Sequence, residues 1–246
     1  MKAPPEAQLK LLDLAELDTE LNRLEHRRRA LPEAQEYDKA QARDAELRDE
    51  LATLEAQSSD LGREQAKAER DVEQVRTRIE RDRTRLDAGQ VSAARELENL
   101  QSEIASLERR QGDLEDVVLE VMERAEALSG RRDALTAERE ELAGRLTELA
   151  AARDAALGDI AGQGAKASEQ RAAIAVEVPG TLLELYDKLR AQHGVGAAAL
   201  RRGRCEGCHL SLNTVELGQI RAAPPDEVLR CEECRRILVR TPESGL

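Results

Sequence analysis

The chain has 246 residues, a formal net charge of −12 and charged side chains at 36% of its positions, but neither Phe nor Trp. A compact core normally uses aromatic side chains for bulk, so most of this chain is not expected to be globular. Its abundance of charged residues and Ala/Leu is typical of coiled coils. From Ala173 onward, ten basic and ten acidic residues balance. Residues 1–172 therefore carry the whole negative excess, which argues against nucleic-acid binding along that part.

The first predicted helix begins after Pro4-Pro5, since Pro is tolerated in the first helical turn. Leucines recur along it at seam spacing from Leu14 to Leu31. Pro32 cannot continue that helix without losing a hydrogen bond. We therefore expect a kink or break beside Pro32, followed by a second helix that continues to Leu86.

The chain is predicted to fold back on itself within Asp87–Ser92. Apolar residues at heptad spacing run up to this segment and away from it, and their phase breaks near Gly89. Such a seam needs a partner helix. Antiparallel pairing would bring Ile79 opposite Ile104, so we expect one hairpin within the chain, with Ser92 as the N-cap of its second helix. Two successive parallel coiled coils in a homodimer are the alternative.

The predicted hairpin tip is richer in arginine than the rest of the hairpin. Six arginines and three acidic residues lie between Arg76 and Arg95. This reversal of charge makes the tip a candidate contact for an acidic protein or a phosphate backbone, with ordinary helix decoration as the alternative. The candidate residues at the tip are Arg81, Arg83 and Arg85.

The segment after the hairpin is predicted to connect it to a small C-terminal domain. The heptad pattern weakens after Ile160, and Val178–Gly180 is a clear stop. Thr181 is expected to cap a short amphipathic helix that ends near His193-Gly194. This helix should pack the base of the hairpin against the C-terminal domain, and a strand-like stretch should follow over Ala197–Arg204.

Two Cys-x-x-Cys pairs with 22 residues between them are the most specific chemical signal in the chain. Each pair places two thiolates on one side of a tight turn, and two pairs complete the four-thiolate tetrahedron that Zn²⁺ prefers. An iron–sulfur cluster and a redox dithiol fit this spacing less well. Four thiolates fill the shell, so His193 and His209 are not needed and one structural zinc is expected. The predicted ligands are Cys205, Cys208, Cys231 and Cys234.

The motifs resemble those of a known family. Arg95–Ile104, Leu182–Arg190 and the two Cys-x-x-Cys pairs are similar to segments of bacterial four-cysteine zinc-ribbon proteins with a long coiled-coil hairpin. The resemblance implies a hairpin of two long helices with a small zinc ribbon at its base. It also implies a nucleic-acid-binding protein or a protein adaptor, and some members are linked to a sigma factor and to flagellar gene expression.

Together the patterns predict a mostly α protein with two domains. The first is a long antiparallel coiled-coil helical hairpin, residues 1–172. The second, residues 173–246, contains the connecting helix and the zinc ribbon.

Seven arginines flank the predicted zinc turns, and convergence of the turns on one metal would gather them. Arginine suits phosphate contacts. The domain has a net charge near zero, however, and only Tyr186 as an aromatic residue to stack a base. We therefore expect weak, salt-sensitive nucleic-acid binding at most, and a protein partner is equally compatible. The candidate binding residues are Arg201, Arg202, Arg204, Arg230, Arg235, Arg236 and Arg240.

An RNA polymerase accessory factor is the alternative function. Coiled-coil hairpins and zinc ribbons occur in such factors, and some present an acidic pair that helps to hold a catalytic Mg²⁺. Asp226-Glu227 is such a pair on an expected ribbon loop, although an ordinary acidic turn is the simpler explanation. The sequence carries no hydrolase triad, phosphate loop or dinucleotide fingerprint. We therefore expect a non-enzymatic protein connected to transcription or RNA metabolism.

Localisation is expected to be cytoplasmic. No apolar run approaches the ~20 residues of a membrane span, and the N-terminal segment lacks the apolar core of a signal peptide. In a reducing compartment, four cysteines are better suited to binding metal than to forming disulfides. The expected partners are a protein, a nucleic acid or both, with no membrane and no small-molecule substrate.

Overall fold

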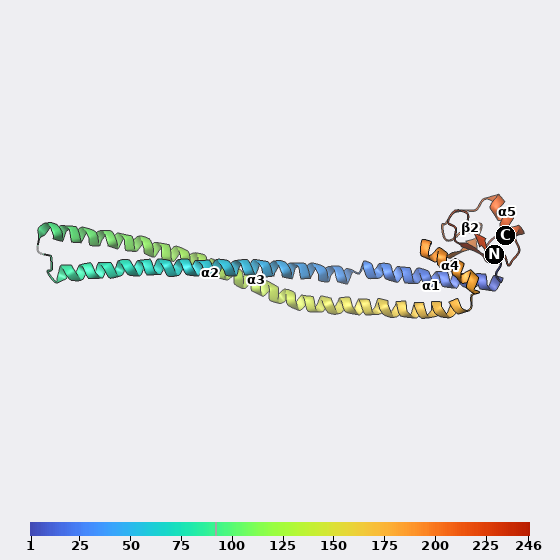
Figure 1. Cartoon of the computed structure of the whole chain (residues 1–246), viewed down its shortest axis with the longest axis horizontal. Helices are drawn as coiled ribbons and strands as arrows, with labels where there is room; N and C mark the ends of the chain where they lie inside the picture. The colour runs from blue at the N-terminus through green and yellow to red at the C-terminus, as the bar shows by residue number, and fades with distance from the viewer. Residues whose placement is uncertain (92) are drawn as a thin grey trace. The chain divides into compact units, whose positions relative to one another are not determined.

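The computed structural model, drawn in Figure 1, describes residues 1–91 and 93–246. Its internal contacts divide it into two compact units. The base unit contains Met1–Gln35 and Ala150–Leu246, and the hairpin unit contains Glu36–Leu149. Helix α3, Ala94–Val176, runs through residue 172 without a break. The predicted division after residue 172 therefore does not coincide with a gap between elements and stays a prediction. Within the described ranges, no helix is long and apolar enough to cross a bilayer.

The hairpin unit is built from α2, Pro32–Asp87, and α3, which follows a short turn. Ile79, Leu100 and Ile104 are buried together near this turn, so the two helices cover each other's apolar seams within one chain. The predicted antiparallel hairpin is confirmed, and no second copy is needed to bury this seam. Ser92, the predicted N-cap, lies outside the described residues.

Ion pairs across the hairpin fix the same antiparallel register. Arg43 contacts Glu138 at 2.9 Å, and Arg124 contacts Glu64 at 3.3 Å. These side chains are exposed, and an exposed pair contributes at most about 1 kcal/mol. They therefore select the register of the helices more than they hold the hairpin together; burial of the seam supplies the main stabilisation.

The base unit begins with α1, Pro5–Arg29, which has Pro in its first turn as predicted. The expected break is confirmed, because α1 ends at Arg29 and α2 begins at Pro32. Leu24, Leu31 and Ile160 are buried together around this break. The chain can therefore interrupt the helix here without exposing the apolar seam to water.

Helix α4, Gly180–His193, is the predicted connecting helix. The expectation that Thr181 caps it is wrong, because Pro179 occupies the N-cap and no side chain caps the helix. Pro179 cannot donate a backbone hydrogen bond and suits the start of a helix. The helix therefore begins at Gly180, two residues earlier than a cap at Thr181 would allow. At the other end, Gly194 adopts φ 79°, the left-handed conformation that ends many helices.

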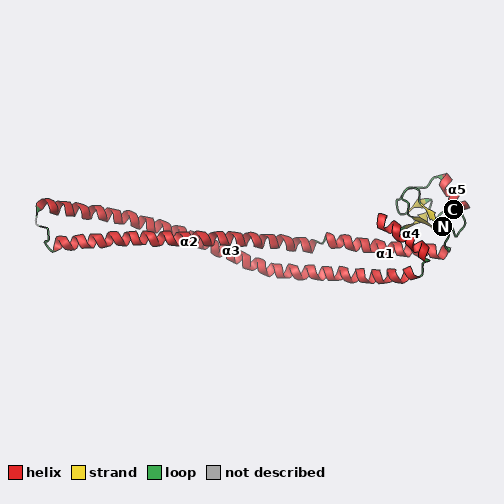
Figure 2. Ribbon diagram, in the orientation of Figure 1, coloured by secondary structure: helices red, strands yellow, loops and turns green. Residues whose placement is uncertain are grey.

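The ribbon contains a four-stranded sheet and one short helix, and its strands are drawn in yellow in Figure 2. The strand order is β2-β1-β4-β3, with β1 parallel to β4 and the outer pairs antiparallel. The single strand expected over Ala197–Arg204 is instead two strands, because a tight turn at Arg202-Gly203 separates them. The elements are β1 (Ala197–Arg201), β2 (Arg204–Cys205), α5 (Thr214–Ala222), β3 (Leu229–Arg230) and β4 (Ile237–Arg240).

The sheet is apolar on both faces, and successive residues alternate between two cores as a pleated strand requires. Ala197 and Ile237 are buried with Leu14 of α1 and Tyr186 of α4. The next residues along β1 and β4 are buried on the other face with the cysteines. The sheet thus separates the helical base from the metal centre, and α4 packs against it as predicted.

Candidate metal centre and arginine surfaces

The first Cys-x-x-Cys turn follows directly from strand β2. The backbone N–H of His209 donates to the carbonyl of Cys205 at 2.8 Å, and the N–H of Cys205 donates to the carbonyl of Leu210 at 3.0 Å. These bonds close a tight loop around Cys208. Gly207 fits inside it because a Cβ there would lie 2.9 Å from the Cβ of Ala198.

The second turn repeats the first. The N–H of Arg235 donates to the carbonyl of Cys231, and the N–H of Cys231 donates to the carbonyl of Arg236, both at 3.0 Å. The residue after the last cysteine of each turn is left-handed, with φ 58° at His209 and 61° at Arg235. Both turns therefore reverse the chain in the same way and direct their sulfur atoms to a common point.

The separations of the four sulfur atoms match the geometry of a zinc site. Cys205 and Cys234 have sulfurs 3.8 Å apart, as do Cys208 and Cys231, and all four lie within 4.8 Å of one another. A tetrahedron with Zn–S bonds of about 2.3 Å has sulfur separations of about 3.8 Å. Two of the sulfurs belong to buried residues and two to partly exposed ones, so the site is closed on its core side.

The thiols differ in acidity in the metal-free protein. Burial raises the pKa of Cys205 to about 12 and also raises the pKa of Cys231. Burial acts in the same direction on Cys234, but hydrogen bonds from Arg236 and from neighbouring thiols outweigh it and lower the pKa. Because zinc binds thiolates, a metal entering the site must displace the protons held most tightly by the buried cysteines.

Three of the predicted binding arginines gather at the β1–β2 turn. Arg201 and Arg204 are paired across the strands, and Arg202 lies in the turn between them with φ 47°. All three are exposed, and Arg201 contacts Glu243 at 3.2 Å. The structure thus brings this subset together on one sheet edge.

Arg230 and Arg235 form a separate pair beside β3, the edge strand on the opposite side of the sheet from β2. The side chain of Arg230, on edge strand β3, donates to the carbonyl of Arg235 at 2.9 Å. Strand β4 lies between β3 and the two strands that carry the β1–β2 turn. The seven predicted arginines are therefore not one continuous cluster.

The remaining two ribbon arginines hold the fold together. Arg236 donates to the carbonyls of His193, Val195 and Gly207, each at 3.1 Å. Arg240 donates to one carbonyl in α5, that of Ile220, and to four in the connection between α5 and β3. Both guanidinium groups are occupied by backbone, so a phosphate would have to compete with these bonds.

At the hairpin tip, much of the arginine charge is balanced locally. Arg81 and Arg85 lie 3.5 and 3.9 Å from the buried carboxylate of Asp82, and Arg83 pairs with Glu108 on α3. Arg81, Arg83 and Arg85 remain exposed. Binding of a partner at this tip stays a prediction.

The acidic pair Asp226-Glu227 is tied to the N-terminal segment. Lys2 contacts the carboxylate of Asp226 at 3.1 Å, and the N–H of Ala3 donates to the backbone carbonyl of Asp226 at 2.7 Å. Lys2 and Glu227 also form a β-bridge. The pair thus lies on a loop that the backbone holds in place, and one of its carboxylates already has a cation beside it.

Sequence reasoning missed a buried polar network in the base unit. Asp18 is fully buried, and its carboxylate lies 2.8 Å from Arg171, 2.8 Å from Arg190 and 2.6 Å from the hydroxyl of Tyr186. This network joins α1, α3 and α4. Its signal in the sequence is an aspartate seven residues after Leu11, where the seam would otherwise carry an apolar residue.

The fold and the four-thiolate centre together define a coiled-coil hairpin protein with a small zinc ribbon. The sequence matches the CT398-like coiled coil hairpin domain over residues 14–194 and the C4-type zinc ribbon domain over residues 204–238. The chain belongs to this family of hairpin and zinc-ribbon proteins, as its motifs indicated. One structural zinc is the cofactor that such a four-cysteine ribbon holds.

Relatives and solved structures cover nearly the whole chain. An uncharacterized protein of Mycobacterium tuberculosis is 40% identical over 98% of both chains, and one of Mycobacterium leprae is 31% identical over 94% of this chain and 95% of its own. A structure from Mycobacterium smegmatis has a TM-score of 0.85 at 38% identity and covers 98% of this chain and all of its own. CT398 from Chlamydia trachomatis shares the fold, with a TM-score of 0.78 at 19% identity over 96% of this chain and 98% of its own.

Proposed function

We propose that this protein is a non-catalytic adaptor whose zinc ribbon contacts the phosphates of nucleic acid, in transcription or RNA metabolism in the cytoplasm. The observation that carries the proposal is the β1–β2 turn, which presents Arg201, Arg202 and Arg204 from one edge of the sheet. The turn fixes the backbone that carries these arginines, and the planar guanidinium group suits hydrogen bonds to phosphate oxygens.

The zinc supports this surface and takes no part in chemistry. Catalytic zinc sites use three protein ligands and keep one position open. We assign Cys205, Cys208, Cys231 and Cys234 as four ligands, which closes the shell. Cys205 ends the β1–β2 hairpin, so zinc binding also fixes the turn that carries the arginines.

The proposed binding is electrostatic and not specific for base sequence. Four thiolates with one Zn²⁺ add about −2 of charge near the arginines. Tyr186, the aromatic residue of the C-terminal part, is fully buried and offers no stacking surface. Affinity should therefore fall steeply with salt, as phosphate contacts do.

The test is a fluorescence-anisotropy titration of labelled single-stranded RNA with the zinc-loaded protein at several salt concentrations. Arg202→Ala with Arg204→Ala should weaken binding and lower the salt slope by about 1.4, because each lost contact to a single strand contributes about 0.7. The matched control, Arg109→Ala with Arg110→Ala, removes two exposed arginines from α3 of the hairpin unit and should leave binding unchanged. Equal losses in both variants, or no binding at 50 mM salt, would overturn the proposal.

The contacts of Asp226 argue against the polymerase accessory alternative. Its carboxylate lies beside Lys2, and the backbone bonds of its loop hold the acidic pair against the N-terminal segment. An acidic pair that completes a metal site in another protein must instead be free to reach into that site. A transcript-cleavage assay with purified polymerase tests this directly, and stimulation that disappears in Asp226→Asn would favour the accessory factor.

A further inference from the structure

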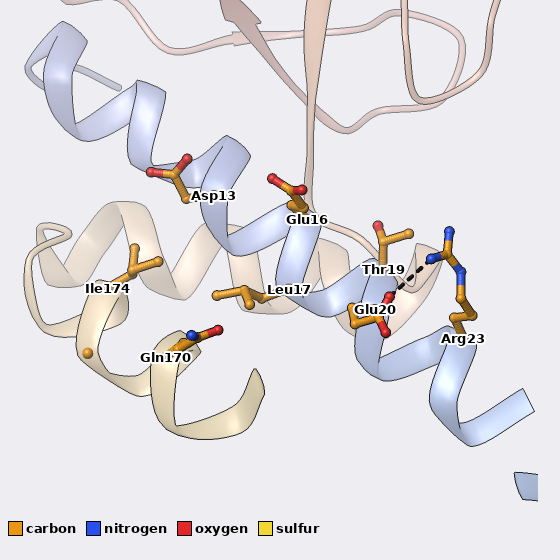
Figure 3. A pocket seen from close by; sticks show the side chains of 9 residues that line it. Asp13, Glu16, Leu17, Thr19, Glu20, Arg23, Gln170 and Ile174 are labelled. Atoms are coloured by element: carbon orange, nitrogen blue, oxygen red, sulfur yellow. Dashed lines mark hydrogen bonds and ion pairs between the residues drawn. The ribbon is translucent and has the colours of Figure 1, made fainter. Parts of the chain in front are cut away.

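An open groove lies between α1 and α3 within the base unit, with a volume of about 880 Å³ (Figure 3). Figure 3 shows Leu17 on α1 directed toward the segment of α3 that carries Gln170 and Ile174. Leu17 belongs to the leucine seam of α1, yet it is only partly buried and joins none of the buried clusters of the described residues. A seam position of this kind normally packs against another helix.

Carboxylates line the groove along α1. Asp13, Glu16 and Glu20 contribute to its wall, spaced over about two helical turns. Glu20 is paired with Arg23 at 3.1 Å. Asp13 and Glu16 are exposed, and neither has an ion-pair partner among the described residues. The lining thus combines an incompletely covered apolar strip with negative charge that the chain does not balance.

We propose that this groove binds a basic amphipathic helix of a protein partner. Leucine or alanine side chains on one face of that helix would cover Leu17 and Ile174, and lysine or arginine on its flank would face Asp13 and Glu16. The α1 residues that line the groove run from Asp13 to Arg23, about 15 Å, which matches a partner helix of three turns. Helix-in-groove recognition places its anchors at i, i+3, i+4 and i+7.

This inference rests on the proposed adaptor role but uses a surface different from the ribbon arginines. It gives the protein two contacts of opposite charge: a basic turn for phosphate and an acidic groove for a cationic helix. The two sites can be tested separately, because Arg202 and Arg204 do not line the groove.

The probe is a fluorescein-labelled synthetic peptide of 15 residues with Leu and Ala on one helical face and Lys on its flanks. Its binding to the full-length, zinc-loaded protein is measured by anisotropy in 50 and 300 mM salt. Asp13→Lys with Glu16→Lys should weaken binding by about tenfold or more, because attraction becomes repulsion. Leu17→Gln should weaken it by about threefold or more through loss of apolar contact. Wild-type binding should also weaken at the higher salt.

Matched controls decide whether the groove is responsible. Asp49→Lys with Glu55→Lys makes the same charge change at exposed positions on α2 without ion-pair partners among the described residues, and should leave binding unchanged. Arg202→Ala with Arg204→Ala should also bind the peptide normally, whatever its effect on RNA. A scrambled peptide of the same composition, whose apolar residues do not fall on one helical face, should bind more weakly. Circular dichroism confirms that each variant keeps its helices.

Three results would overturn the inference: no peptide binding by the wild-type protein at 50 mM salt, equal effects of the groove and control variants, or a homodimer whose assembly is lost with Asp13→Lys and Glu16→Lys. The last, measured by sedimentation velocity, would mean that a second copy covers the groove. If the wild-type protein binds the peptide but not RNA, the proposed phosphate contact is contradicted, whereas the proposed peptide site in the groove is not.

Discussion

Left-handed residues shape both metal-binding turns. His209 and Arg235 follow the last cysteine of their turns and adopt φ near 60°. A residue with a Cβ pays about 1–2 kcal/mol for this conformation. The backbone bonds around each turn and the metal must offset this cost, so the zinc-free turns should be less well defined.

Arg235→Gly should stabilise the zinc-loaded ribbon by about 0.5–1 kcal/mol, since Gly adopts positive φ without the Cβ penalty but loses more entropy on folding. The backbone carbonyl that accepts from Arg230 is retained. Thermal unfolding of the ribbon, monitored through the release of zinc, measures the change in stability. Arg204→Gly, in strand β2, is the control and should destabilise. A lower midpoint for Arg235→Gly would show that the arginine side chain contributes more than the strain it costs.

Cys208→Ser should abolish tight zinc binding and unfold the ribbon, because the metal and the cysteine core stabilise the same small domain. The hairpin should keep its helical circular dichroism, since α2 and α3 bury their own seam. Metal analysis should fall from about one zinc per chain to nearly none. Leu210→Ala, a half-exposed position beside the same turn, should keep the metal. Retention of zinc by Cys208→Ser would contradict the assigned ligand set.

At the scale of the elements, Asp18 is the point where α1, α3 and α4 are joined. A buried carboxylate is tolerated only when it is paired and hydrogen-bonded. Two arginines and a tyrosine hydroxyl meet that requirement here. The network fixes the positions of the three helices against one another, because shifting one of them would leave a buried charge without partners.

Asp18→Ala should therefore lower the free energy of unfolding of the base unit by about 3–5 kcal/mol. Tyr186→Phe removes one hydrogen bond and should cost about 1–2 kcal/mol. The control, Asp187→Ala, removes an exposed partner of Arg171 and should cost less than about 1 kcal/mol. Urea unfolding of the three variants gives the ranking, and equal effects of Asp18→Ala and Asp187→Ala would contradict the importance of burial.

The same network predicts a dependence on alkaline pH. Burial and the hydrogen bond to Asp18 raise the pKa of Tyr186 above its usual value of about 10. Above pH ~10 the unfolded chain releases this proton while the folded protein keeps it, so stability is complete below that pH and falls as pH rises. The urea midpoint should decline between pH 9 and 11 more steeply in the wild type than in Tyr186→Phe. Parallel declines would contradict the assignment.

At the scale of the whole molecule, the hairpin turn converts two long apolar seams into one intramolecular coiled coil. Arg78 on α2 pairs with Glu103 on α3 in the same chain, and Arg43 pairs with Glu138. The partner on α3 moves back along the chain as the residue on α2 moves forward, as an antiparallel arrangement requires.

Spin labels at Arg78 and Glu103, attached by chemistry that spares the zinc cysteines, should therefore lie close together. Their dipolar coupling should persist when labelled protein is mixed with excess unlabelled protein, because both labels are on one chain. A label pair at Arg78 and Glu140, far apart along the hairpin, is the control and should show no close distance. Loss of the Arg78–Glu103 signal on dilution would indicate pairing between chains.

The sequence by itself determined the local features of this protein. Heptad spacing, Pro32 and Gly89 predicted where the helices begin and end, since these signals act over a few residues. The spacing of the cysteines predicted the zinc ribbon in the same way. The short strands and the cap at Pro179 were less well predicted, because hydrogen bonds to neighbouring segments decide them.

Only the tertiary structure decided which polar residues are engaged inside the fold. Arg236 and Arg240 look like their neighbours in sequence, yet they bind backbone carbonyls up to 43 residues away. Asp18 finds its partners more than 150 residues along the chain. Such contacts depend on how the helices and the sheet pack, and a side chain's neighbours across the fold leave no periodic pattern in the sequence. The groove beside Leu17 has the same origin: heptad spacing predicts an apolar seam, but packing determines where the seam stays uncovered.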